Sequence, residues 1–374
     1  MKIHSLRFLG CLALSSAILC SAVPAEAQQT KILTAEKHNE YGLVYSLPVT
    51  ALQVSVTGRR TVRKAGPFRQ YAKRYLGMAN VVSEDAVEWT ITGVKVQTIG
   101  VRDNETQYLM QLKAGATTFI GVSEDGMLLS INARPEEPDT EFDGSRQLTG
   151  NVVKAGGGVD DYLQFVDMDY VSAQNSMKQA EMVATSLMDV RDAYLSLTRG
   201  TADNMPSDGR QLELMLASLR QQEEALTRAF AGSVTIEEFS SVYTYIPEDE
   251  GEEVLFRISD FDGFVDADDY SGSPVYIKTE IIVEGALPLD VNGEPKKFPK
   301  DGVVYAIPGT ARISIASGSD NLFSKELEFS QFGTQFALAP SLFTDKKSPS
   351  FARFSPVTGA LEEIGKVTES ADNE

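Results

Sequence analysis

Two regions of alternating apolar and polar residues, separated by one helical region, constrain the fold of this 374-residue chain more than any other feature. In the first region, Val87–Thr92 and Gly93–Ile99 alternate with period two, as a strand with one buried face does. In the second, strand-like runs follow Ser233 and include Pro274–Val283 and Thr310–Ala316. The pattern predicts an α+β protein with two strand-rich domains, each a sandwich or a meander, and a helical hairpin between them.

The helical region, Ser172–Gly232, repeats apolar residues at the spacing of one helix face. The repeats are Val183, Leu187, Val190, Tyr194 and Leu197, then Leu212, Met215, Leu219, Leu226 and Phe230. Gly200 lies between the two sets and favours a left-handed cap that ends the first helix. We therefore expect two amphipathic helices whose apolar stripes, including Leu219 and Leu226, are buried on neighbouring elements. A face that binds a partner is the alternative.

These patterns divide the chain into six segments. The segments are a signal peptide (1–27), an N-terminal β-rich domain (28–133), an acidic and glycine-containing linker or loop (134–160), a helical hairpin (161–232), a C-terminal β-rich domain (233–366) and a frayed polar tail (367–374). One short helix is also expected within the N-terminal domain, because Pro67 suits a first helical turn and Gly77 suits the left-handed residue that follows the last.

The first 27 residues have the pattern of an export signal. Phe8–Val23 is a run of 16 apolar or small residues, shorter than the roughly 20 that a membrane-spanning helix needs. Ala25 and Ala27 are small residues of the kind that a signal peptidase recognises, so cleavage before Gln28 is expected. The mature chain then has no transmembrane segment, and we expect it in the periplasm or associated with the outer membrane. Lipid attachment at Cys20 is the alternative, although Leu19, the residue directly before this cysteine, is not small.

Composition removes most catalytic chemistry from the mature chain. Cys11 and Cys20 both lie in the predicted signal, which excludes a thiolate nucleophile and a thiolate metal site. His38 is then the only histidine, so a multi-histidine metal site is excluded and a serine triad lacks its usual motif. Two carboxylates are the remaining route to hydrolysis, as in glycosidases, but no pair stands out. Trp89, which could otherwise stack on a sugar ring, alternates with apolar residues and is expected to face the core. We therefore assign no catalytic residue.

The charge distribution is uneven: the chain has 34 Lys+Arg, 53 Asp+Glu and a net charge of −19, yet no acidic residue occurs from Gly42 to Val82. The basic residues of this stretch are Arg59, Arg60, Arg63, Lys64, Arg69, Lys73 and Arg74. If exposed, they form a positive patch that attracts an acidic envelope protein or an anionic envelope component such as lipopolysaccharide phosphate. The simpler alternative is pairing with the protein's own carboxylates. Nucleic acid is not expected as a partner of an exported acidic protein.

One acidic segment resembles part of a calcium loop. It contains the carboxylates Asp260, Asp262, Asp266 and Asp269. Gly263 has the place of the sharp turn in a helix–loop–helix calcium site, but the first ligand position falls on Ile258 and no helices are expected to flank the segment. We therefore expect a solvated strand turn and no cofactor, with a calcium site as the alternative.

Four motifs occur in an order that is typical of one family. They are Glu40–Pro48, Ala65–Gly77, Ala202–Gly209 and Arg220–Thr227. Together they resemble the domain-of-unknown-function family 4831 of exported Bacteroidota proteins. The resemblance implies an envelope protein of a Gram-negative bacterium and carries over no functional residue. We therefore predict a non-catalytic exported envelope protein that acts as a binding or scaffold module. A carboxylate-dependent glycan hydrolase and a lipid-anchored outer-membrane accessory protein are the alternatives.

Overall fold

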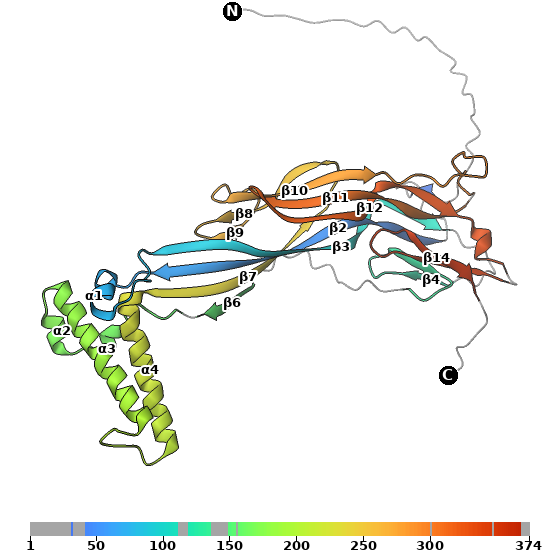
Figure 1. Cartoon of the computed structure of the whole chain (residues 1–374). Coiled ribbons are helices and arrows are strands. Elements are labelled where there is room, and N and C mark those ends of the chain that lie inside the picture. The colour runs from blue at the N-terminus through green and yellow to red at the C-terminus, as the bar shows by residue number, and fades with distance from the viewer. Residues whose placement is uncertain are drawn as a thin grey trace, which may run out of the picture.

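The computed structural model describes residues 31–32, 42–110, 119–135, 149–154, 156–299, 301–345 and 348–367. The predicted signal peptide and its cleavage site, Cys20, His38, residues 136–148 of the predicted linker and the tail from Thr368 lie outside the described residues. The described part is an elongated body of three antiparallel sheets, with a helical hairpin projecting from one end (Figure 1). The predicted α+β, strand-rich class is confirmed.

The first sheet is built on two long strands. Its order is β1 (Lys31–Ile32), β3 (Ala86–Met110), β2 (Leu43–Lys64), β7 (Ser233–Tyr245) and β6 (Thr149–Lys154). β2 contains 22 residues, which corresponds to about 70 Å at about 3.3 Å per residue, and it pairs with β3 along nearly all of this length. Pro48 lies at a β-bulge, and the strand continues through it.

The second sheet packs on the first, and the third lies at the end of the body away from the hairpin (Figure 1). The second has the order β12 (Asp320–Leu338), β11 (Val303–Ser317), β10 (Ser273–Val283), β8 (Gly251–Ser259) and β9 (Gly263–Val265). The third has the order β14 (Leu361–Lys366), β13 (Ser350–Phe354), β5 (Leu128–Ile131) and β4 (Ile120–Val122), and a 3-10 turn, η3 (Pro340–Leu342), precedes β13. The central core joins Leu52, Val54 and Val56 of β2 to side chains of the second sheet that include Ile277, Ile313 and Phe329. A separate core next to the third sheet contains Tyr45, Leu128 and Phe354.

Strands from both strand-rich segments share sheets. β2 pairs with β7 from Leu52–Tyr245 to Lys64–Ser233, and β5 pairs with β13 in the third sheet. The boundary expected at the hairpin therefore does not separate two domains in space. The reason is physical: alternation identifies a strand by its buried face, but it does not identify the strand's neighbours.

The helices lie together at one end of the body. The hairpin is α3 (Ser176–Arg199) and α4 (Gly209–Ala231), preceded by η2 (Asp161–Phe165) and α2 (Met168–Ser172). Gly200 has the left-handed conformation predicted for the cap of α3, with φ 70°. The predicted short helix is a 3-10 turn, η1 (Arg69–Tyr71), followed by α1 (Ala72–Leu76), which ends at Gly77 with φ 65°.

Burial within the hairpin differs from the expectation. Leu226 is fully buried as predicted, but Leu219 is only half-buried, so its predicted burial is wrong. Apart from Leu197 near the tip, the buried hairpin residues lie near the root. There, side chains of α3 and α4 pack against those of the short turns: Val183, Leu187, Phe230, Phe68 and Tyr162. Farther from the root, α3 and α4 have mainly each other to pack against (Figure 1). Among the described residues, no helix is long and apolar enough to cross a membrane.

Candidate functional site

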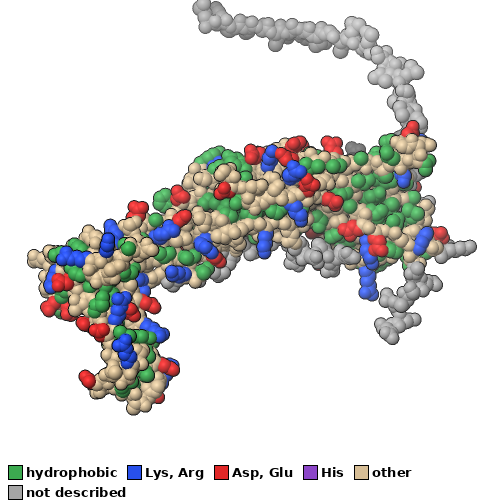
Figure 2. Space-filling view, in the orientation of Figure 1, with side chains coloured by type: hydrophobic (Ala, Val, Ile, Leu, Met, Phe, Trp, Pro, Cys, Tyr) green, Lys and Arg blue, Asp and Glu red, His purple; other side chains and the backbone are tan. Residues whose placement is uncertain are grey.

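The seven basic residues lie at the end of the body that carries the hairpin. Arg59, Arg60, Arg63 and Lys64 belong to β2, Arg69 to η1, and Lys73 and Arg74 to α1. Successive side chains of a strand point to opposite faces, so the four β2 cations cannot all form one surface. Figure 2 shows basic and acidic side chains close together at this end of the molecule.

Each of the four β2 cations forms an ion pair within the protein. The pairs are Arg59–Glu238 and Arg60–Glu237, both 3.0 Å, and Arg63–Glu88 and Lys64–Asp85, both 2.8 Å. The first two carboxylates belong to β7 and the third to β3, so the partners lie on neighbouring strands. For these four residues, the geometry favours pairing with the protein's own carboxylates over a free positive patch.

Arg60 is less exposed than the other cations of β2. The side chains of Arg60 and Glu237 are 34% and 23% exposed, whereas those of Arg59 and Glu238 are 45% and 47% exposed. The guanidinium of Arg60 also lies 5.8 Å from the ring centre of Trp89, which itself packs against two phenylalanine rings. The prediction that Trp89 faces the core is confirmed, and Arg60 covers one side of it.

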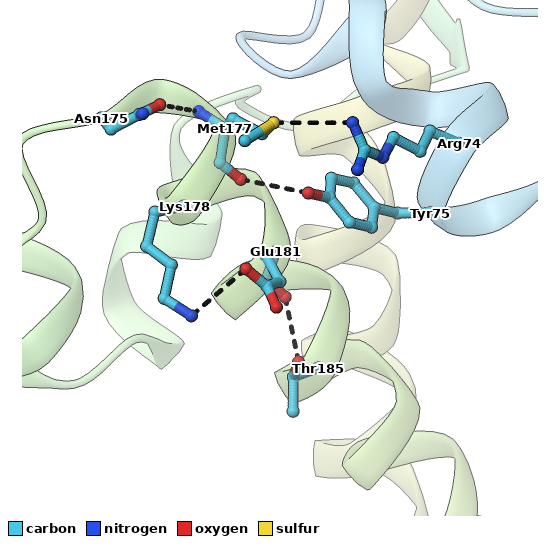
Figure 3. A network of polar contacts seen from close by, with 7 residues as sticks. All are labelled: Arg74, Tyr75, Asn175, Met177, Lys178, Glu181 and Thr185. Carbon is cyan, nitrogen blue, oxygen red and sulfur yellow. Dashed lines mark hydrogen bonds and ion pairs between the residues drawn. The ribbon is translucent and has the colours of Figure 1, made fainter.

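The remaining cations, Arg69, Lys73 and Arg74, are exposed and form no ion pair within the described part of the chain. Figure 3 shows how α1 is held against α3 beside them. Arg74 donates a hydrogen bond to the Met177 sulfur at 3.6 Å, and the Tyr75 hydroxyl donates to the Met177 carbonyl at 3.4 Å. The same arginine lies over the Tyr75 ring at 5.6 Å. These contacts fix α1 while leaving its charges at the surface.

The first turns of α3 satisfy their own polar groups in the same view (Figure 3). Asn175 caps the helix, because its side-chain oxygen accepts a hydrogen bond from the Met177 backbone N–H at 2.8 Å. Glu181, the acidic residue of these turns, pairs with Lys178 at 3.2 Å. The Thr185 hydroxyl donates to the Glu181 carbonyl at 3.0 Å. The carboxylate of Glu181 is therefore engaged within α3.

A groove of about 980 Å³ lies where the hairpin joins the first sheet. Residues 80–84, the first residues of β3 and β7, and one side of α4 line it. Its charged residues are Arg63, Lys154, Arg191, Arg228, Glu84, Glu223 and Glu224. Arg191 pairs with Glu223 at 2.7 Å, and Arg228 pairs with Asp161 at 2.9 Å. The described lining contains no aromatic side chain, so it offers no stacking platform for a sugar ring.

A smaller cleft of about 420 Å³ brings part of the basic run next to the acidic segment. Its charged and aromatic lining residues are Arg60, Arg63, Lys64, Asp85, Asp260 and Phe261. Hydrogen bonds from the Lys64 ammonium and the Ala65 backbone N–H hold the pKa of Asp85 below its usual value. The Nε atom of Arg60 and the Nε1 atom of Trp89 are buried with no hydrogen-bond acceptor among the described residues. Three cations and two carboxylates line the cleft, and each of the three cations is already ion-paired within the protein.

The acidic segment forms turns on either side of β9. All four carboxylates, Asp260, Asp262, Asp266 and Asp269, are exposed. The Ser271 backbone N–H donates to Asp269 at 2.9 Å and lowers the pKa of that carboxyl. Within the described ranges, no group of three or more His, Cys, Asp or Glu side chains is placed to hold a metal ion. The calcium alternative thus gains no support from the geometry.

Two sets of residues were not predicted from the sequence: the carboxylates that form ion pairs with the basic run, and the charged residues that line the groove. Glu238 is 179 residues from Arg59, and only the pairing of β2 with β7 brings the two together. The available signal was the adjacent pair Glu237 and Glu238 inside an otherwise strand-like run. In the groove, Arg191 and Glu223 lie 32 residues apart on two predicted helices, and no spacing rule relates them.

Comparison with known proteins places the chain by family alone. No curated protein and no solved structure matches it. One family model matches residues 41–362. This range includes the hairpin, the groove, the cleft and the three sheets except β1 and most of β14. The chain belongs to the family described as Domain of unknown function (DUF4831).

Proposed function

We propose that this chain is a non-catalytic protein of the bacterial envelope that acts as a binding scaffold. In this proposal a long sheet forms a shaft, and the hairpin end of the shaft contacts an anionic envelope component. Export, a location in the periplasm or at the outer membrane, and a Bacteroidota source are parts of the proposal. They rest on the pattern of residues 1–27 and on the family resemblance.

The observation that carries the proposal is the long ladder in which β2 pairs with β3 and β7 and continues through two β-bulges. β2 pairs with β3 from Leu43 to Arg63 and with β7 from Leu52 to Lys64. The second sheet covers one face of this ladder, and separate cores lie next to the third sheet and at the hairpin root. A covered ladder about 70 Å long resists bending, as a spacer between two contact points must.

The cations of η1 and α1 support the choice of the hairpin end as the contact end. Arg69, Lys73 and Arg74 are exposed there without ion pairs in the described part of the chain, and the rest of the basic run is paired. An exposed cation attracts an anionic partner, whereas a cation already paired with a carboxylate contributes little. The binding hypothesis therefore moves from β2 to these three residues.

The groove supports a binding role over hydrolysis. Glu223 is paired with Arg191, and Glu224 lies 3.9 Å from Arg228. A hydrolase of the two-carboxylate kind needs two carboxyl groups that flank the substrate, whereas both of these glutamates are engaged by arginines of the protein itself. The hydrolase alternative has no specific observation in its favour.

Sedimentation of the protein with isolated cell envelopes tests the proposal. The variant combines Arg69→Glu, Lys73→Glu and Arg74→Glu, and the matched control combines Lys296→Glu, Lys297→Glu and Lys325→Glu, which changes the net charge equally at exposed sites. We expect the wild type and the control to sediment with envelopes at low salt and the variant to remain in solution. Raising the salt from 0.1 M to 1 M shortens the screening length from about 10 Å to about 3 Å and should release the wild type.

Two results would overturn the proposal. Equal loss of envelope association in both triple variants would mean that only net charge matters. Release of reducing sugars from purified envelope glycans by the wild-type protein, at a rate that follows protein concentration, would replace the scaffold by a hydrolase.

A further inference from the structure

β3 has a long free edge. β2 pairs with one side of β3, and on the other side β1 pairs with it at Tyr108 and Leu109. Between Ala86 and Gln107, the outer edge of β3 pairs with no strand among the described residues. The backbone groups along such an edge are available to any strand that approaches, which is why natural sheets usually shorten, cover or charge their edges.

The sequence of this edge protects it only sparingly. Ala86–Val101 contains two charged residues, Glu88 and Lys95, among β-branched, aromatic and small residues. Both charged side chains are exposed; Lys95 forms no ion pair among the described residues, and Glu88, which pairs with Arg63 at 2.8 Å within the chain, keeps a second carboxylate oxygen for a lysine of another copy. β-Branched and aromatic residues favour pairing with another strand. Because the edge carries one charge of each sign, two antiparallel copies can place opposite charges across from each other.

We propose that the outer edge of β3 pairs antiparallel with the same edge of a second copy of this chain. The two five-stranded sheets then form one continuous sheet across a twofold axis. A twofold contact uses the same surface on both copies, so each pairing occurs twice. This proposal goes beyond the scaffold role and does not depend on it.

The two charged residues define the register. Pairing Glu88 of one copy with Lys95 of the second also pairs Lys95 with Glu88 of the second copy. Both side chains belong to the same exposed face of the sheet, although their numbers differ in parity, because a bulge at Thr92 shifts the pleat by one residue. The bulge is visible in the ladder with β2, where Thr57 pairs with Gly93 but Gly58 pairs with Ile91.

The opposite face agrees with this register. It pairs Val87 with Val96 of the second copy and Trp89 with Val94 of the second copy. Val87 is 41% exposed in the single chain. A recess of about 470 Å³ is lined by Val94–Gln97 of β3, by Gln53 and Ser55 of β2, and by Phe323 of β12. The register places the exposed valine of the second copy opposite Val96, one of these lining residues.

The hairpin leaves the edge free for this contact. α4 continues into β7, which is separated from β3 by β2 in the order of the sheet. The twofold axis passes between Ile91 and Thr92, about 20 Å from the first residue of β3 at about 3.3 Å per residue. The hairpin ends of both copies therefore lie near the centre of the dimer.

Charge reversal followed by charge exchange tests the register. The variants are Glu88→Lys, Lys95→Glu and the double exchange Glu88→Lys/Lys95→Glu, and Lys297→Glu is the matched control at an exposed site away from β3. Sedimentation equilibrium of the chain from about 1 to about 100 µM gives the dissociation constant. We expect a dimer for the wild type. Each single reversal places like charges opposite each other twice and should weaken the dimer about tenfold or more, whereas the double exchange should restore it.

Backbone amide exchange gives a second readout that does not depend on the variants. Amides of residues 86–97 in the wild type should exchange more slowly at the higher concentration, while those of β12 should not change. A monomer over the whole concentration range overturns the proposal and means that Lys95 and the bulge protect the edge. A dimer whose dissociation constant is the same in the three β3 variants and in the Lys297→Glu control overturns the register and the choice of β3.

Discussion

Arg60→Met is expected to destabilise the protein far more than Arg59→Met, although the two arginines are adjacent and form ion pairs of the same length. Methionine keeps most of the aliphatic stem and removes the charge. Arg60→Met leaves the Glu237 carboxylate, which is 23% exposed, without its partner, at a cost of about 1–3 kcal/mol. Loss of the cation over the Trp89 ring adds about 0.5–1 kcal/mol. The sum is about 1.5–4 kcal/mol, against about 0–1 kcal/mol for the exposed Arg59 pair.

Urea unfolding followed by tryptophan fluorescence measures both variants at the site itself, because Trp89 is the single tryptophan of the chain. Arg60→Met should lower the unfolding midpoint and change the native emission of Trp89. A double variant with Glu237→Gln should lose less than the sum of the two single variants, since the pair is already broken. Equal midpoints for Arg60→Met and Arg59→Met, with an unchanged native emission, would show that partial burial does not make the Arg60–Glu237 pair more stabilising than the Arg59–Glu238 pair.

Three further predictions concern stability. Leu226→Ala should cost about 2–5 kcal/mol in denaturant unfolding, because this side chain is fully buried at the hairpin root, whereas the half-buried Leu219→Ala should cost under about 1.5 kcal/mol. Tyr45→Phe should cost about 1–3 kcal/mol, since the buried hydroxyl donates to the Val304 carbonyl at 3.2 Å and accepts from its N–H at 2.8 Å; a loss under about 0.5 kcal/mol would contradict this. The pKa of Asp85 is lowered, so its contribution to stability is complete above the usual aspartate value of about 3.9 and is lost as the pH falls through the lowered value. Asp85→Asn should therefore remove a step from stability measured against pH on the acid side, and an identical profile would argue against the interaction.

The sequence predicted the elements of this fold better than their arrangement. Alternation in Val87–Thr92 and Gly93–Ile99 identified β3, and the helical repeats with Gly200 identified the hairpin. The pairing of β2 with β7 could not be predicted, because the pattern of a strand records which face is buried and not which strand lies beside it. The prediction for Leu219 was wrong for a related reason: an apolar stripe on a helix is buried only as far as other elements reach.

The candidate site was predictable only in part. The cluster of basic residues can be recognised in the sequence. Both an exposed positive patch and pairing with the protein's own carboxylates are compatible with it. Which of the cations are paired depends on the register that sets Arg59 opposite Glu238 and Arg60 opposite Glu237. Arg69, Lys73 and Arg74 lie beyond the end of β2, so no strand of the sheet pairs with the segment that carries them. The split of the run into paired and exposed groups is thus a consequence of where β2 ends.

Photo-crosslinking in living cells tests most directly the claim that the hairpin end of the shaft is the contact end. A photoreactive residue replaces Lys73 on α1 in one strain and Thr244, an exposed residue of β7 within the shaft, in another. We expect a crosslinked product in the envelope fraction for position 73, its loss when Arg69→Glu and Arg74→Glu are added, and no such product for position 244. Equal products from both positions, or a product from position 244 alone, would show that the hairpin end is not the contact end.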